Sequence, residues 1–306
     1  MRPARQREPV DGVLLLDKPA GITSNAALQK AKWLLNAEKA GHTGTLDPFA
    51  DGLLPLCFGE ATKFAGYLLD ADKHYRAVMR LGVTTTTGDP EGEILDTREP
   101  TADCARITAV LPRFTGEIDQ IPPMHSALKH QGRPLYEYAR AGIDIERPAR
   151  RVRIHALDLV DCAPPQVVLD VQCSAGTYIR SLAQDIGAAL GCGAHLTALT
   201  RTAAGGFTLD EAHSLAEIET LDVAGRRALL APPDALLAHL PAARLDADDA
   251  SALRQGRSIA YPAATSGLMR VYAPSGAFIG LVDAKQGLLV PHRLVATHSA
   301  AAPRIA

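Results

Sequence analysis

The amino-acid sequence predicts an α/β (α+β) protein that ends in a small β-rich domain. Apolar residues recur at every second position in some segments, which predicts strands, and three or four positions apart in others, which predicts helices. Near the C-terminus two apolar runs flank a Pro-Ser-Gly sequence, a pattern typical of a β-hairpin. The chain has 306 residues, of which 47% are hydrophobic, so it can bury a sizeable core.

The first predicted elements are a strand and a helix. The apolar run from Val13 to Leu16 predicts the strand, and the sequence "KPAG" shortly after it predicts a turn. Thr23 or Ser24 can cap the helix that follows, because a hydroxyl accepts a hydrogen bond from a free amide of the first turn. The buried face of this helix would consist of Leu28, Ala31 and Leu35.

The central part of the chain predicts two more strands and a helix. Strand periodicity runs from Tyr75 to Val83, leads into the turn-rich sequence "TTTTGDPEGEI", and returns from Gln166 to Cys173. The sequence "SAGTYIRSLAQDIGAALG" then has helical periodicity, with Gly191 as the C-terminal cap. Arg180 lies roughly 100° from the centre of the apolar stripe of this helix, so its side chain is free to reach a partner.

The last third of the chain has weaker signals until the hairpin. From about Thr200 to Pro241 the sequence is rich in Ala and Leu, and we expect connecting helices there. The hairpin would join strands around Met269 to Ala273 and Phe278 to Val282 through the turn at residues 274–276.

Charge and cysteine content exclude some classes of protein. The formal net charge is −2, so the chain is no polycation that binds nucleic acid over its whole surface. Five arginines share one short segment and would either contact phosphates or form a solvated face: Arg140, Arg147, Arg150, Arg151 and Arg153. The five cysteines contain no C-x-x-C pair, which predicts neither a disulfide framework nor a zinc site. No long apolar run follows the N-terminal arginines, so we expect no signal peptide, no membrane span and a reducing cytoplasm.

The segment "AGHTGTLDPFADGLLPL" is the first candidate for chemistry. Its glycines and prolines predict a shaped loop that holds Asp47 near His42. It matches neither phosphate-binding glycine motif. Asp47 could be a nucleophile, a general base or only a loop cap, and Arg180 could be its ion-pair partner or a surface residue.

Two tyrosines lie at junctions between predicted elements. Tyr75 opens a strand and Tyr178 opens a helix, and such rings either stack on an extruded base or pack in the core. Lys18 and His42 are read from the residues alone as a surface charge and a loop residue.

Five segments, in this order, resemble the TruB family of bacterial tRNA pseudouridine-55 synthases. They are "GVLLLDKPAGITS", "AGHTGTLDPFADGLLPLCFGEATKF", "QIPPMHSALKHQGRPLYEYAR", "CSAGTYIRSLAQDIGAALGCGAHLTALTR" and "GLVDAKQGLLVPHRL". The resemblance implies a catalytic domain over residues 1–240, with a mixed, mostly antiparallel sheet flanked by helices. It implies a PUA-type RNA-binding domain over residues 241–306.

The resemblance also implies roles for individual residues. Asp47 matches the catalytic aspartate, Arg180 its ion-pair partner, and Tyr75 the ring that stacks on the target base. Four residues match substrate-binding positions: the pocket residues Tyr178 and Leu199, His42 in the place of displaced T-loop bases, and Lys18, whose role is structural or RNA-facing. The chain departs from the family at His74, where Arg or Lys is common, and at His125, where Tyr is common.

The implied reaction isomerises uridine 55 in the T-loop of tRNA to pseudouridine after the base flips out. The expected partner is the tRNA T-stem loop, with no cofactor, metal, membrane or guide RNA, and the enzyme is expected to be a monomer. Three other functions remain to be compared. These are a non-catalytic RNA-binding or RNA-folding protein, a guide-RNA-dependent relative, and a glycosidase that uses Asp47 and Asp51.

Overall fold

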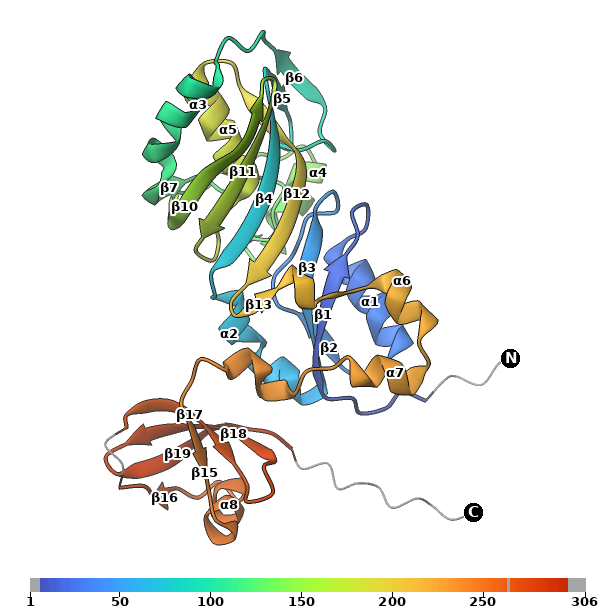
Figure 1. The fold of residues 1–306 in the computed structure, drawn as a ribbon, viewed down its shortest axis with the longest axis vertical. Helices are drawn as coiled ribbons and strands as arrows, with labels where there is room; N and C mark the ends of the chain where they lie inside the picture. Colours follow the sequence, from blue (N-terminus) through green and yellow to red (C-terminus); the bar gives the residue numbers. More distant parts are fainter. Residues whose placement is uncertain (1–5, 263–264, 297–306) are drawn as a thin grey trace.

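The computed structural model describes residues 6–262 and 265–296, which form two sheets with flanking helices (Figure 1). The larger sheet has ten strands in the order β14-β1-β3-β12-β4-β11-β10-β7, with β2 paired to β3 and β13 to β12. Its strands are β1 (Gly12–Lys18), β2 (Ala40–His42), β3 (Asp51–Phe58), β4 (Lys73–Leu81), β7 (Gly116–Gln120), β10 (Arg150–Ala163), β11 (Gln166–Cys173), β12 (Ala194–Ala204), β13 (Phe207–Thr208) and β14 (His213–Ser214). Only the β1–β14 and β3–β12 pairs are parallel, which confirms the mixed, mostly antiparallel sheet.

Helices and small ribbons surround this sheet. Its helices are α1 (Ser24–Leu34), α2 (Ala65–Leu69), α3 (Cys104–Val110), α4 (Leu135–Arg140), α5 (Ile179–Leu190), α6 (Leu215–Thr220) and α7 (Val223–Ala228), whereas α8 (Ala247–Arg254) lies against the smaller, C-terminal sheet. The short 3-10 helices are η1 (Gly59–Phe64), η2 (Leu111–Phe114), η3 (Leu209–Glu211) and η4 (Pro233–Leu237). Two-stranded ribbons pair β5 (Val83–Thr85) with β6 (Ile94–Thr97) and β8 (Lys129–His130) with β9 (Arg133–Pro134). Within the described ranges, no helix has the length and apolar character that a membrane span requires.

The predicted helix ends are confirmed. Thr23 is the N-cap of α1, and its hydroxyl accepts a hydrogen bond from the amide of Ala26 at 3.0 Å. Gly191 is the C-cap of α5 with a φ of 84°, a left-handed conformation that glycine adopts without strain.

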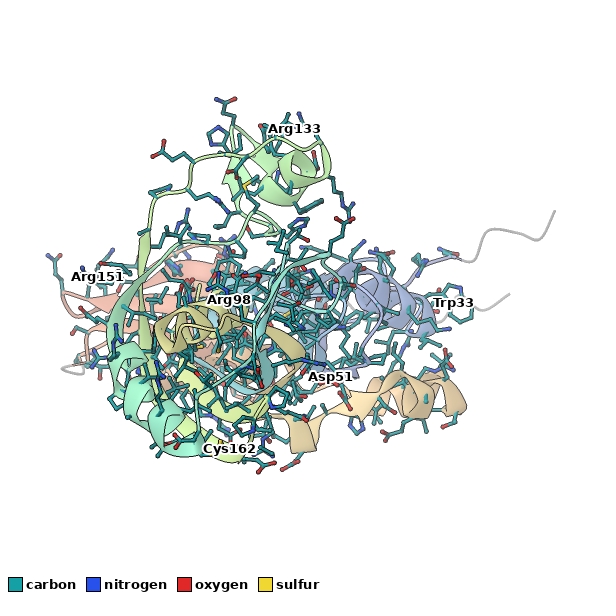
Figure 2. The ribbon with its side chains drawn as sticks, turned by 90° about the horizontal axis from the view of Figure 1, so that it is seen from above. Trp33, Asp51, Arg98, Arg133, Arg151 and Cys162 are labelled. Atoms are coloured by element: carbon teal, nitrogen blue, oxygen red, sulfur yellow. A yellow bond between two sulfur atoms is a disulfide. The ribbon has the colours of Figure 1, made fainter. Side chains whose placement is uncertain are left out.

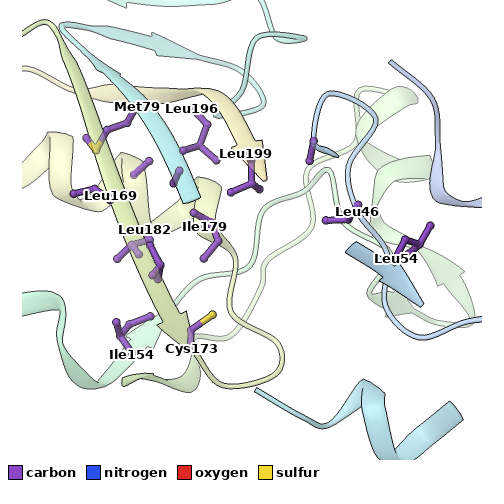
Figure 3. Close-up of a cluster of buried hydrophobic side chains, with 14 of the residues drawn as sticks. Leu46, Leu54, Met79, Ile154, Leu169, Cys173, Ile179, Leu182, Leu196 and Leu199 are labelled. Atoms are coloured by element: carbon purple, nitrogen blue, oxygen red, sulfur yellow. The ribbon is translucent and has the colours of Figure 1, made fainter. Parts of the chain in front are cut away.

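The core lies between α5 and the sheet. Leu182 of α5 packs with Met79, Leu169 and Leu196 from the three adjacent strands β4, β11 and β12 (Figure 3). Because these strands are neighbours in the sheet, one helix face covers all three. This packing fixes the N-terminal end of α5, where Arg180 lies.

A second sheet forms the C-terminal part, as the hairpin pattern predicts. Its strands are β15 (Ala242–Arg244), β16 (Ile259–Ala260), β17 (Gly267–Tyr272), β18 (Phe278–Lys285) and β19 (Leu288–Leu294). It has its own buried core and also packs on the first part, where the rings of Phe64 and Phe278 lie 5.5 Å apart. Residues 297–306 of the expected C-terminal domain lie outside the described residues.

The expectation of connecting helices from about Thr200 to Pro241 is wrong for the first residues of that range. Thr200 to Ala204 continue β12, a central strand that pairs with β4 on one side and β3 on the other. Pairing on both sides outweighs the helical preference of an alanine-rich sequence. The helices α6 and α7 follow later in the range.

The expectation that no disulfide forms is also wrong. Cys104 at the start of α3 and Cys162 in β10 form a disulfide, whereas Cys57, Cys173 and Cys192 are buried free thiols. The two half-cystines are 58 residues apart in sequence, and only the packing of α3 against β10 brings them together. In Figure 2, Cys162 lies at the opposite side of the molecule from Arg133, which belongs to a projecting arm formed by residues 121–149.

Candidate active site

Asp47 lies in the connection between β2 and β3, which we call the Asp47 loop (residues 43–50). Leu46 anchors this loop in the core, and its amide and carbonyl both hydrogen-bond to the Ser24 hydroxyl, at 2.8 and 2.9 Å. Gly44 has a φ of 121°, which a side chain would strain. Gly44 and Leu46 therefore fix the loop just before Asp47, which gives Asp47 a defined direction.

Lys18 supports the Asp47 loop through a hydrogen bond to Pro48. Its side chain is fully buried, and its ammonium group donates to the carbonyl oxygens of Pro19, Ile22 and Pro48 at 2.9, 2.8 and 3.4 Å. Burial lowers the pKa of Lys18 to about 8. Of the two roles that the resemblance allows, this geometry fits the structural one, because no donor of Lys18 faces the surface.

Arg180 forms a two-point ion pair with Asp47. The Arg180 Nε lies 2.9 Å from one carboxylate oxygen of Asp47, and Nη2 donates to the other at 3.1 Å. The side chain of Arg180 is only 4% exposed and that of Asp47 is 31% exposed. The structure therefore brings together the two residues that the sequence left 133 positions apart.

Arg180 has three further partners, which sequence reasoning missed. Its Nη1 lies 3.2 Å from the buried carboxylate of Asp89 and donates to the Thr87 carbonyl at 3.1 Å. Its Nη2 also donates to the His125 carbonyl of the arm at 2.7 Å. Asp89 lies in the sequence that only predicted turns, and no local signal marks it as an ion-pair partner.

Burial and charge act on Asp47 in opposite directions. Burial raises the pKa of Asp47 above its ordinary value, the Arg180 guanidinium opposes this rise, and the carboxylate of Asp89 adds to it. A carboxylate with a raised pKa is a better base and nucleophile than one in water, and the ion pair still keeps it oriented.

A cavity of about 340 Å³ opens beside Asp47. Tyr75 from β4, Tyr178 at the start of α5 and Leu199 from β12 line it, together with Asp47 and Arg180. Burial raises the pKa of both tyrosines, so both phenols are neutral at physiological pH. This volume and its mixture of apolar and polar groups are typical of a small-ligand site.

Gln120 fixes the backbone of Tyr178. Its amide group accepts from the Tyr178 amide at 2.7 Å and donates to the Tyr178 carbonyl at 2.9 Å. Gln120 ends β7, so the edge of the sheet sets the position of the first residue before α5.

A second cavity, of about 460 Å³, shares Asp47 and Arg180 with the first. His42 lines it, together with His125 of the arm. Burial lowers the pKa of His42, and the nearby Arg201 guanidinium lowers it further, so the imidazole is neutral. The His42 Nδ1 is buried and lacks a hydrogen-bond partner among the described residues.

The clustered arginines lie on the arm and the strand that follows it. Arg151 pairs with Asp119 on the exposed face of the sheet, and Arg147 donates to the carbonyls of Pro122 and Ile145. Arg140 lies over the ring of Tyr136 and lines the second cavity. The cluster is thus partly structural and partly directed at the site.

Asp51 does not complete a two-carboxylate site. It opens β3 and lines neither of the two cavities that contain Asp47. Its charge acts instead on Asp17 and Lys18. A glycosidase that uses Asp47 and Asp51 has no support in this geometry.

Comparison with known proteins identifies the family. The TruB family pseudouridylate synthase N-terminal domain matches residues 32–179, the tRNA pseudouridylate synthase B C-terminal domain matches residues 180–238, and the pseudouridine synthase II TruB C-terminal domain matches residues 241–295. Proteins named tRNA pseudouridine synthase B are similar over nearly the whole chain. That of Thiobacillus denitrificans is 70% identical over 97% of this chain and 99% of its own length, and that of Chromobacterium violaceum is 54% identical over 98% and 99%.

Solved structures of more distant proteins have a similar fold. A chain from an H/ACA RNP bound to a substrate RNA containing 2′-deoxyuridine has a TM-score of 0.70 at 25% identity, over 94% of this chain and 86% of that one. A chain of a Cbf5-Nop10-Gar1 complex has a TM-score of 0.68 at 29% identity, over 89% and 78%. By its matched domains and its full-length relatives, the chain belongs to the TruB family of pseudouridylate synthases.

Proposed function

We propose that this protein isomerises uridine 55 in the T-loop of tRNA to pseudouridine, with Asp47 as the group that starts the reaction. One observation carries this proposal: the Asp47 carboxylate, oriented by a buried arginine, faces a cavity lined by two tyrosines. Family membership and relatives named tRNA pseudouridine synthase B support the reaction and the substrate class.

The two cavities suit a flipped nucleotide. A uridine inside a folded loop must leave the stack before its glycosidic bond is accessible, at a cost of a few kcal/mol. In our proposal the first cavity receives the base, with Tyr75 stacked on it and Tyr178 and Leu199 as its other walls. His42, which is neutral and lines the second cavity, takes the place that the displaced loop bases leave.

Three first steps are open to the carboxylate of Asp47. It can attack C1′ and form an ester, add to C6 of the base, or remove the C2′ proton so that elimination forms a glycal. Each step needs an ionised carboxylate held in one direction, and the ion pair with Arg180 provides that direction. The reaction rearranges one nucleotide without gain or loss of atoms, so we propose that it uses no cofactor.

We further propose a monomer that acts on the T-stem loop without a guide RNA. This chain is 70% identical to a protein named tRNA pseudouridine synthase B, but only 25% and 29% identical to chains solved in an H/ACA RNP and in a Cbf5-Nop10-Gar1 complex, which supports this choice. In this proposal residues 1–240 catalyse the reaction, residues 241–306 form the PUA-type RNA-binding domain, and the enzyme works in the cytoplasm.

The proposed function has a direct test. Purified protein is incubated with an unmodified tRNA transcript, without added metal or partner, and pseudouridine is mapped by carbodiimide treatment and primer extension. We expect product at uridine 55 with the wild type and with Asp51→Asn, and none with Asp47→Asn, which should keep its fold and its RNA affinity. A fully active Asp47→Asn would contradict the proposal. Tight tRNA binding by a wild type that forms no product would instead support a non-catalytic RNA-binding protein.

A further inference from the structure

Arg201 is a buried arginine at the proposed site that the sequence analysis did not single out. It is only 1% exposed and is one of the largest fully buried side chains among the described residues. It lies on the central strand β12, two residues after Leu199, so both side chains are on one face of that strand. Both line the cavity that contains Asp47.

The guanidinium of Arg201 joins the Asp47 loop to β3. Its Nε donates to the Leu53 carbonyl at 2.7 Å, and its Nη2 donates to the Gly44 carbonyl at 3.3 Å. These two acceptors lie on either side of Asp47 in the sequence. Arg201 also lies directly opposite Tyr75 across the β12–β4 pair.

The charge of Arg201 has no acidic partner. Across residues 6–262 and 265–296, no carboxylate oxygen lies within 4 Å of it, whereas Arg180 has two carboxylates within that distance. The field of Arg201 extends to the groups around the cavity, because it lowers the pKa values of His42 and Lys73 and limits the rise at Tyr75. The cavity wall therefore carries an uncompensated positive charge.

This charge bears on the reaction proposed above. When the bond between C1′ and N1 breaks, its electron pair stays with the base, so uracil separates as an anion, and Asp47 bonds to C1′ or accepts the C2′ proton. In a cavity that excludes water, a fixed positive charge stabilises such an anion more than it would in solution.

We propose that Arg201 is a positioning residue of this site, which holds the Asp47 loop against β3 and whose unpaired charge stabilises the detached uracil anion. The proposal rests on the proposed function and adds a residue to it. It assigns two separable properties to one side chain, the forked hydrogen bonding and the charge.

Two substitutions separate these properties. Arg201→Lys keeps the charge and loses the fork, and Arg201→Met loses both at similar volume. The control is Arg76→Met on β4, because Arg76 forms an exposed ion pair with Asp170 and lines neither cavity. Two tRNAs are compared, with uridine or with 5-fluorouridine at position 55, because fluorine stabilises the detached anion without help from the protein.

The measurements are the single-turnover rate of consumption of the target nucleotide, tRNA affinity and thermal unfolding. We expect Arg201→Met to lower the single-turnover rate on the uridine tRNA about 100-fold, with unchanged tRNA affinity. The rate on the 5-fluorouridine tRNA should fall clearly less. We expect Arg201→Lys to lower the rate on both tRNAs by the same factor, and Arg76→Met to leave both rates unchanged.

Equal losses on both substrates for Arg201→Met would overturn the electrostatic half of the proposal, and a wild-type rate for Arg201→Lys would overturn the positioning half. If Arg201→Met does not fold, Arg201→Lys still tests the proposal. A larger loss of rate for Arg201→Lys on the uridine tRNA than on the 5-fluorouridine tRNA would contradict the separation of the charge from the forked hydrogen bonding. A wild type without pseudouridine product contradicts the proposed function itself, whereas an active wild type with fully active Arg201 variants contradicts only this inference.

Discussion

Replacement of Arg180 by Met tests how much the buried ion pair contributes to the site. The guanidinium contacts two oxygens of Asp47, one oxygen of Asp89 and two backbone carbonyls, all at 2.7–3.2 Å. Methionine fills a similar space but donates no hydrogen bond. The substitution therefore leaves two carboxylates close to each other with no cation between them.

The expected loss follows from the burial of each partner. A charge-assisted hydrogen bond contributes about 1.5–3 kcal/mol. The contact with Asp89, whose side chain is 4% exposed, should be lost at its full value, because water cannot replace it. The Asp47 side chain is 31% exposed, so water can replace part of what it loses. We expect the free energy of unfolding to fall by about 3–5 kcal/mol. We also expect the pKa of Asp47 to rise further, since the guanidinium now opposes its rise and the carboxylate of Asp89 promotes it.

The structure supplies a matched control. Arg76 forms the same two-point contact with Asp170, both at 2.9 Å, but the two side chains are 53% and 41% exposed. Arg76→Met should therefore lower the free energy of unfolding much less than Arg180→Met does. Urea unfolding of both variants measures the difference, and primer extension measures activity. Equal unfolding losses in the two variants would refute the argument that burial decides the contribution of the pair.

Three other substitutions have definite expected outcomes. Asp89→Asn removes a charge that raises the pKa of Asp47, so the acidic limit of kcat/KM should move to lower pH, and an unmoved limit would show that Asp89 does not act on Asp47. Gly52→Ala places a Cβ 2.5 Å from a carbonyl oxygen of β12 at a φ of 94°. Urea unfolding should therefore show that the free energy of unfolding falls by more than about 2 kcal/mol. Gly21→Ala should lose less, because no atom lies within 4 Å of the Cβ that it adds. Cys104→Ser should lower the free energy of unfolding by about 4 kcal/mol under oxidising conditions and by little with dithiothreitol. An equal loss in both conditions would contradict a cross-link that closes 58 residues.

Periodicity predicted those elements whose buried face repeats regularly. The helix α5 has a continuous apolar stripe and a glycine cap, and both its ends were predicted correctly. The strand β12 was not predicted, because its sequence "AHLTALTRTAA" is rich in small residues that a helix also accepts. What makes it a strand is its pairing with β4 and β3, which are distant in sequence. The disulfide between α3 and β10 escaped prediction for the same reason.

The residues of the candidate site that lie in a recognisable motif were predicted, whereas those that only packing brings to the site were missed. Asp47 lies in a segment specific enough for recognition, and Arg180 follows a clear strand and glycine turn. Asp89 and Arg201 have no such local mark, because their partners are contributed by other elements. Burial of charge is the physical signal that reveals them, and a sequence alone does not contain it.

The central position of β12 has a consequence for how this protein can change in length. Side chains along a strand alternate between its faces, so the insertion or deletion of one residue before Leu199 would turn both Leu199 and Arg201 away from the cavity. The ribbon of β8 and β9 is paired only with itself, and its exposed tip at Gln131 and Gly132 lines neither cavity, so this tip can gain or lose residues. We therefore expect natural length variation to accumulate in that ribbon, while β12 keeps a fixed number of residues between its glycine-rich start and its end.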